Sequence, residues 1–204
     1  VDPDNGNPLW YMDEKDANDN LTGKRVTTSD YASANYYYVN KSSLPKVYGG
    51  FNTSLSWKGF DLSAIFAYSI GGYIYNRDIT MILHNGSLEG RDWSTEILKR
   101  WTPENRYTDV PALSTTSNNW NSASTRFLQN NSYMRLKNLT LSYDLPKQWI
   151  SKLALSSVQV FVQGDNLFTI HRNQGLDPEQ GITGITYYRY PAMRTISGGI
   201  NLSF

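Results

Sequence analysis

The sequence contains no cysteine among its 204 residues, so neither a disulfide bond within the chain nor a thiolate metal site is possible. It also has no excess of one charge, because 19 basic residues are balanced by 18 acidic ones for a net charge of +1. That balance gives no reason to expect nucleic acid as a partner. The longest apolar stretch, residues 62–70, is too short for a membrane helix. If the chain spans a membrane, it must do so with β-strands.

Signals for export and for catalysis are absent as well. Val1 leads directly into polar residues without the apolar core of a signal peptide, so any export signal is expected outside this sequence. His84 and His171 lie far apart with no nucleophile pattern nearby and are interpreted as solvated loop residues, so we predict no enzyme. The acidic run from Asp13 to Asp19 lacks the spacing of a calcium-binding loop. We expect no catalytic residue, no metal ion and no other cofactor.

Aromatic residues are what the sequence does have. They make up 14% of the chain, against a mean hydropathy of −0.52, a combination that favours half-buried strands over helices. Five stretches alternate apolar and polar residues with a period of two, which is typical of strands with one apolar face. They cover residues 47–58, 60–70, 133–144, 157–168 and 195–204.

Local features interrupt or join these strands. Lys58-Gly59 is expected to form a tight turn. A β-bulge near Lys137-Asn138 is needed to keep the apolar residues on one face. Pro146 to Leu153 can form a helical turn that begins at the proline. Phe161 is an exception, since its parity places it on the polar side.

The connections alternate between short and long. Residues 1–45 lack a sustained period and are expected to form a long loop, while residues 46–204 hold the strands, with further loops near 77–130 and 170–191. Trp93, Ile97 and Trp101 recur at helical spacing, which predicts a short helix in the first of these loops. Short turns opposite long loops are typical of bacterial outer-membrane barrels. This arrangement predicts that the C-terminus is periplasmic and that the long loops lie at the cell surface.

Aromatic residues gather at both expected ends of the strands. At the end with short turns lie Trp57, Phe60, Tyr143, Trp149 and Phe204. At the end with long loops lie Tyr48, Tyr73, Tyr75, Tyr133 and Phe168. Two such belts are expected where aromatic rings sit at the level of the lipid headgroups.

Five is an odd number of strands for a closed barrel. An open five-stranded sheet in lipid leaves two edges of unpaired backbone groups, each of which costs several kcal/mol. We therefore expect an all-β fold, an antiparallel transmembrane β-barrel segment whose first and last strands pair with strands outside this sequence. A soluble β-sandwich also alternates and also bears aromatics, but it does not require this asymmetry of loops.

Several stretches resemble one family, the SusC/RagA-type TonB-linked outer-membrane proteins. They are LPKVYGG at 44–50, WKGFDLS at 57–63, RWTPEN at 100–105, YMRLKNLTL at 133–141, DNLF at 165–168, GLDPE at 175–179 and RTISGGINLSF at 194–204. These stretches run in family order, and the chain resembles the C-terminal part of such a protein.

The resemblance implies a 22-stranded barrel of which this chain supplies about five C-terminal strands. It implies further partners: the remaining strands, a plug, a TonB complex reached through a segment not in this chain, outer-membrane lipid, and a SusD-like surface lipoprotein that closes as a lid. The implied substrates are glycans or peptides. The family's signal for barrel assembly maps onto Ile200, Leu202 and Phe204.

Aromatic residues in the expected loops are candidates for contact with a substrate or a partner. Packing within the loops, or the outer aromatic belt, explains them equally well. The candidates are Trp10, Tyr11, Tyr36, Tyr37, Tyr38, Trp93, Trp101, Trp120, Tyr187 and Tyr188.

Three functions compete at this point. A segment of a nutrient importer requires the first and last strands to pair with other segments. A small self-contained outer-membrane barrel, such as an adhesin, requires an even strand count and terminal strands that pair with each other. A soluble carbohydrate-binding β-domain requires solubility without detergent.

Overall fold

The computed structural model describes residues 1–86, 88–114, 119–151, 155–173, 175, 177–179, 183–186 and 188–204. The chain forms two compact units, which are considered separately. Unit 1 comprises Val1–Asn40 and Asn76–Leu128, and unit 2 comprises Lys41–Tyr75 and Gln129–Phe204.

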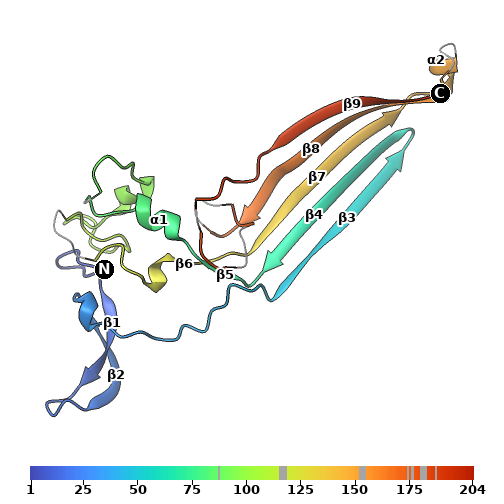
Figure 1. The fold of residues 1–204 in the computed structure, drawn as a ribbon. Helices are drawn as coiled ribbons and strands as arrows, with labels where there is room; N and C mark the ends of the chain where they lie inside the picture. The colour runs from blue at the N-terminus through green and yellow to red at the C-terminus, as the bar shows by residue number, and fades with distance from the viewer. Residues whose placement is uncertain are drawn as a thin grey trace. The chain divides into compact units, whose positions relative to one another are not determined.

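Unit 2 is built on a five-stranded antiparallel sheet (Figure 1). Its strands, in spatial order, are β3 (Val47–Trp57), β4 (Phe60–Ile70), β7 (Tyr133–Asp144), β8 (Ser157–His171) and β9 (Thr195–Ser203). The five strands predicted from the alternation are thereby confirmed. Within the described residues, β3 and β9 each pair with one neighbour only, so they form the two edges of the sheet.

The two short connections lie at one end of this sheet (Figure 1). Lys58 and Gly59 both have positive φ angles, 49° and 87°, which suits the twist of a two-residue hairpin turn. The second connection contains α2 (Lys147–Ile150), which begins directly after Pro146. The expected tight turn at Lys58-Gly59 is confirmed. The expected helical turn after Pro146 is confirmed as far as Ser151, and residues 152–154 lie outside the described part of the chain.

A β-bulge interrupts β7 where the sequence required one. Between Ile65 and Phe66 of β4, the register passes over Lys137 of β7. On the other side of β7, Asn166 and Leu167 of β8 likewise have no directly opposed residue in β7. The bulge keeps the apolar residues of β7 on one face along its whole length.

A second, two-stranded sheet joins β5 (Tyr73–Tyr75) to β6 (Leu128–Asn130). Unit 1 contains a hairpin of β1 (Trp10–Lys15) and β2 (Leu21–Thr28), and one α-helix, α1 (Arg77–Ile82). Among its described residues, the other regular elements are the 3-10 helices Tyr31–Ser33, Thr95–Lys99 and Thr125–Phe127.

The hairpin and α1 were not expected from the sequence. The turn between β1 and β2 is closed by Asp16, whose carboxylate accepts hydrogen bonds from the backbone N–H groups of Asn18 and Asn20 at 2.8 and 3.0 Å. These two bonds hold the pKa of Asp16 below its usual value. Part of the acidic run therefore shapes a turn.

The helix expected around Trp93, Ile97 and Trp101 is present only as a five-residue 3-10 helix. Both tryptophans lie outside it. The backbone N–H of Trp101 donates to the carbonyl of Val110 at 2.8 Å and not to a carbonyl of the preceding turn, so the helix does not continue through Trp101.

Candidate functional site

The strand register places apolar side chains of all five strands on one face of the sheet, because directly opposed residues share a face. These residues include Phe51, Leu55, Trp57, Phe60, Leu62, Phe66, Leu136, Leu139, Leu141, Val160, Val162, Ile196, Ile200 and Leu202. Many are open to the surroundings: Leu55 is 66% exposed, Ile200 63% and Val162 49%. A continuous exposed apolar surface of this kind marks a membrane or protein contact.

The opposite face is polar and hydrogen-bonded. The amide of Asn138 donates to the carboxylate of Asp165 at 2.8 Å, and the amide of Gln159 donates to Asp144 at 2.9 Å. Phe161 lies on this face, as its parity predicted, and is directly opposite Gly199 of β9. A Cβ atom at Gly199 would come within 2.9 Å of the Phe161 ring, so this glycine leaves space for the ring.

An aromatic row crosses the apolar face beside the β3–β4 turn. Trp57, Phe60 and Tyr143 are directly opposed in three neighbouring strands. The ring centroids of Phe60 and Tyr143 are 4.4 Å apart, and the Lys58 ammonium lies 4.9 Å from the Trp57 ring. Such a row is typical of the interfacial girdle of a membrane barrel.

A buried ion-pair cluster lies at the other end of the polar face. Arg135 of β7 is 3% exposed, and its guanidinium contacts Asp177 at 2.5 Å and Glu179 at 2.8 Å. Its Nε atom donates to the hydroxyl of Thr169 at 2.8 Å. Lys137 contacts Glu179 at 2.5 Å. The cluster attaches residues 177–179 to the sheet.

Asp177 is the centre of this attachment. Besides the bond from Arg135, it accepts backbone N–H bonds from Glu179 at 2.9 Å and Ala192 at 2.7 Å. Burial raises the pKa of Asp177, but the two N–H bonds and Arg135 outweigh that effect and lower it overall. The cluster joins the YMRLKNLTL and GLDPE stretches, and sequence reasoning did not identify it. The signal in the sequence that could have indicated the cluster was Arg135, an arginine at a polar-face position of a strand.

Two of the predicted contact residues, Trp120 and Trp101, have packing partners within unit 1. Trp120 is 3% exposed, its indole donates to the carbonyl of Ala112 at 3.1 Å, and the Arg126 guanidinium lies 4.8 Å from its ring. Burial lowers the pKa of Arg126 to about 10, although the nearby Asp109 acts in the opposite direction. The indole of Trp101 donates to the carbonyl of Pro3 at 3.1 Å.

Trp10 and Tyr37 also have partners within unit 1. The ring of Trp10 meets Tyr31 edge to face, with centroids 5.2 Å apart. Tyr37 donates to Asp13 at 2.8 Å and lies under the Arg25 guanidinium at 4.0 Å. Desolvation, followed by the bond to Asp13, raises the pKa of Tyr37. Both residues contribute to packing around the hairpin.

The remaining candidates are more exposed. Their exposed fractions are 60% for Tyr11, 91% for Tyr36, 90% for Tyr38, 46% for Trp93 and 65% for Tyr188. Tyr188 belongs to unit 2, whereas the other four belong to unit 1. Tyr187 lies outside the described residues.

The interpretation of His84 as a solvated loop residue is wrong, because this side chain is 1% exposed. The indole of Trp93 donates to its Nδ1 atom at 3.1 Å, and the backbone N–H of Gly86 donates to the same atom at 3.2 Å. Trp93 thus covers the buried His84, and this contact accounts for some of the burial of the Trp93 side chain. His171, by contrast, is exposed.

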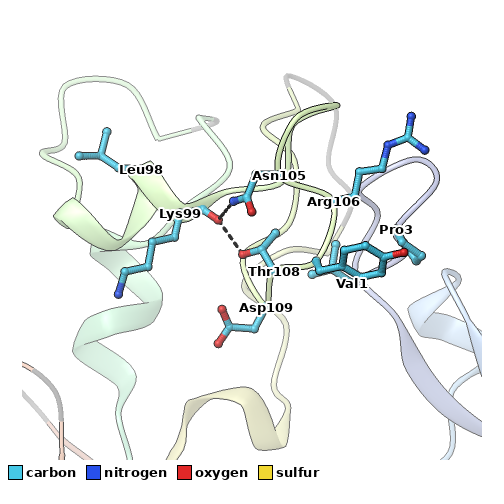
Figure 2. Close-up of a pocket in the computed structure, with 9 residues that line it drawn as sticks. Val1, Pro3, Leu98, Lys99, Asn105, Arg106, Thr108 and Asp109 are labelled. Atoms are coloured by element: carbon cyan, nitrogen blue, oxygen red, sulfur yellow. Dashed lines mark hydrogen bonds between the residues drawn. The ribbon is translucent and has the colours of Figure 1, made fainter.

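An open hollow of about 810 Å³ lies within unit 1 (Figure 2). It is lined by Val1, Pro3, Leu98, Lys99, Asn105, Arg106, Tyr107, Thr108 and Asp109. Asn105 and Thr108 both donate to the carbonyl of Lys99, at 3.0 and 2.6 Å, as the dashed lines in Figure 2 mark. The ammonium of Lys99 is paired with Glu96. The lining offers binding groups but no nucleophile activated by a neighbouring base.

No helix among the described residues is long and apolar enough to cross a membrane. No group of three or more His, Asp or Glu side chains in the same residues is arranged to hold a metal ion.

Comparisons with known proteins agree with this geometry. The chain is 33% identical to TonB-dependent receptor P3 of Formosa agariphila, over 76% of the chain and 16% of the relative. It is 27% identical to TonB-dependent receptor SusC of Bacteroides thetaiotaomicron, over 82% of the chain and 16% of the relative. No family model matches the chain.

Solved structures of the RagAB peptide transporter superpose on the whole chain, with a TM-score of 0.80 and 34% identity, over 22% of the matched chain. The RagAB peptide importer in the "open-open" state gives a TM-score of 0.81 at 33% identity. The chain thus spans about a sixth of the length of the curated relatives and about a fifth of the solved chains.

The fold and its two-faced sheet define a segment of a transmembrane β-barrel. The chain belongs to the TonB-dependent receptors of the SusC/RagA type. These relatives are named as receptors and transporters, not as enzymes, in agreement with the sequence prediction.

Proposed function

We propose that this chain forms part of the wall of an outer-membrane barrel that imports nutrients. The observation that carries the proposal is the continuous exposed apolar face of the five-stranded sheet, set opposite a hydrogen-bonded polar face. In a barrel, the apolar face meets lipid and the polar face meets the lumen. The strands have 9 to 15 residues, enough to cross the hydrocarbon region when tilted.

The barrel is larger than this sheet and has about 22 strands, of which these five are C-terminal ones. Its β3 and β9 edges pair with strands from the rest of the protein, because unpaired backbone groups are too costly in lipid. A plug fills the lumen, and a TonB-contacting segment elsewhere in the protein supplies the link to energy. Ile200, Leu202 and Phe204 serve in barrel assembly, and the end of the sheet that carries the β3–β4 turn faces the periplasm.

The imported nutrient is an oligosaccharide or a peptide, and a SusD-like surface lipoprotein is the partner. The name of one solved relative, a RagAB peptide importer, supports a peptide, and membership of the SusC/RagA type supports the oligosaccharide and the lipoprotein. The exposed aromatics Tyr11, Tyr36, Trp93 and Tyr188 remain candidates for contact with substrate or partner. Trp10, Tyr37, Trp101 and Trp120 are better explained by packing.

The sheet order argues against a self-contained small barrel. That architecture requires the terminal strands to pair with each other, whereas β3 and β9 lie at opposite edges of the sheet among the described residues. The exposed apolar face argues against a soluble domain.

Uptake by the full-length protein tests the proposed function. A strain that lacks the gene should lose growth on one class of nutrient, oligosaccharide or peptide, and should regain it with the intact gene. Growth should fail again when the TonB complex is inactivated. Unchanged growth and uptake of every tested oligosaccharide and peptide in the deletion strain would contradict an importer role.

Cysteine labelling tests the orientation, and the chain has no cysteine of its own to interfere. In full-length protein, Tyr107→Cys should react with an impermeant maleimide on intact cells, because Tyr107 is 93% exposed in the long connection between β4 and β7. Gln148→Cys in α2 should react only after the outer membrane is opened. The reverse pattern would overturn the orientation without touching the barrel assignment.

A further inference from the structure

The long connection between β8 and β9 is fixed to the sheet by buried charges. Arg135 of β7 contacts Asp177 at 2.5 Å and Glu179 at 2.8 Å, and Lys137 contacts Glu179 at 2.5 Å. Asp177 also accepts a bond from the backbone N–H of Ala192 at 2.7 Å, which brings the later part of the connection to the same place. Breaking a buried ion pair is strongly destabilising, so this attachment is stable in the folded protein.

Two further contacts hold the connection within unit 2. The carbonyl of Pro178 accepts a bond from the amide of Asn131 at 2.8 Å, and the Pro178 ring is less than 2% exposed. The backbone N–H of Tyr75 in β5 donates to the carbonyl of Gly184 at 2.7 Å. We call the described residues that these bonds hold the anchored connection: 177–179, 184–186 and 192.

The strand register shows which face of the sheet the anchored connection covers. Arg135 is directly opposite Thr169 of β8, and its Nε atom donates to the Thr169 hydroxyl at 2.8 Å. The next residue, Leu136, is opposite Phe66 on the apolar face. Because neighbouring residues of a strand point to opposite faces, Arg135 and the carboxylates bonded to it lie on the polar face. In a barrel that face borders the lumen.

The connection also lies at the entrance to that lumen. The strands β8 and β9 are joined at the end of the sheet away from the β3–β4 turn (Figure 1). In the proposed function the β3–β4 turn is periplasmic, so the opposite end faces the cell exterior. Nutrients enter an importer from that side.

The cluster acts on a nutrient through its bulk, because its charges cancel. Arg135 and Lys137 are paired with Asp177 and Glu179, and a neutral cluster exerts little long-range attraction or repulsion. We propose that the anchored connection narrows the outer entrance of the lumen and limits the size of the nutrient that the importer admits. This inference rests on the proposed function, in which the polar face borders the lumen.

Cross-linking in the full-length importer tests the position of the anchored connection. This chain has no cysteine, and any cysteine elsewhere in the importer is replaced by serine. Lys137→Cys combined with Glu179→Cys should be joined by a short bifunctional maleimide, and mass spectrometry should detect the linked peptides. Lys147→Cys combined with Glu179→Cys, at opposite ends of the sheet, should give no link. Absence of the 137–179 link in folded barrels would show that the connection leaves the polar face and would overturn the proposal.

Uptake of oligosaccharides and of peptides in graded lengths tests the size limit, with each rate divided by the amount of folded barrel. Arg135→Met releases the connection and should raise the ratio of long to short nutrient uptake at least about threefold. Asp177→Asn, which keeps the shape of the side chain, should change the ratio in the same direction if the first variant yields too little barrel. Lys147→Met in α2 removes a cation at the other end of the sheet and should leave the ratio unchanged.

The outcomes separate this proposal from the proposed function. An unchanged length ratio in both variants, with uptake intact, would overturn the size limit and leave the importer role standing. A changed preference between charged and neutral nutrients of one length would overturn it too, because the entrance would then select by charge. If the unmodified importer takes up no nutrient, the proposed function fails and the size limit fails with it. The cross-link still decides whether the connection lies on the polar face.

Discussion

At the residue scale, Arg135 is the most informative side chain because it is buried and bonded to two carboxylates. Arg135→Met leaves Asp177 buried beside an uncharged neighbour, which should cost about 3–5 kcal/mol. The loss should appear as faster hydrogen exchange and faster proteolysis in residues 188–194. Lys137→Met is the control, because Lys137 is 33% exposed and its pair should contribute less than about 1 kcal/mol. Equal effects from the two substitutions would refute a central role for Arg135.

Asp177 gives this attachment a defined pH dependence. Its pKa in the folded protein lies below the ordinary value of 3.8, so the unfolded state binds protons first as the pH falls. The stabilisation is fully present above that ordinary value and is lost as the pH falls through the lower, folded pKa. The protection of the Ala192 amide, relative to the intrinsic exchange rate at each pH, should therefore be constant from pH 7 to pH 5 and should fall only below 3.8. A loss of protection between pH 7 and pH 5 would implicate another group.

Gly6 is a point at which unit 1 cannot accept a side chain. Its φ angle is 75°, and a Cβ atom there would lie 2.6 Å from the Trp101 ring and 2.7 Å from Ala112. Gly6→Ala should therefore cost about 1–2 kcal/mol for the backbone and about 1–3 kcal/mol more for overpacking. Gly23→Ala is the matched control, since Gly23 has a φ angle of 78° and nothing within 4 Å. Hydrogen exchange of the Trp101 amide should accelerate clearly more in the Gly6 variant.

At the scale of elements, the two faces of β8 make opposite predictions for the same substitution. Val162 lies on the apolar face and Gln163 on the polar face, and both lie away from the ends of the strand. Arginine on a lipid-facing midplane position costs about 2–4 kcal/mol. Val162→Arg should therefore reduce the amount of folded barrel in the outer membrane, while Gln163→Arg should be tolerated. The heat-dependent shift of the full-length protein on gels measures folded barrel, and the opposite ranking would exchange the lipid and lumen faces.

The same elements show how far the sequence could predict the fold. The five strands of unit 2 were predictable because alternation over nine or more residues carries the face assignment, and the bulge at Lys137 followed from a change of parity. The β1–β2 hairpin was not predictable in this way, because its strands have only six and eight residues and are largely polar. Arg135 and Asp177 are 42 residues apart in sequence, so no local pattern could join them. For the candidate contacts, periodicity could not distinguish the buried Trp120 from the exposed Tyr36.

At the scale of the whole molecule, the central claim is that this sheet is one part of the wall of a closed barrel. Its edge strands, Val47–Trp57 and Thr195–Ser203, each have one neighbour within the described chain. In a closed barrel the backbone groups on their outer sides are hydrogen-bonded to further strands, and in an open sheet they are not.

Hydrogen exchange of the full-length protein, resolved to individual amides, distinguishes the two cases. The account predicts that the amides of β3 and β9 that do not bond to β4 or β8 are protected as strongly as those of the central strand β7. Fast exchange of those outward amides, at rates typical of exposed loops, would show that the edges are free and would contradict the barrel.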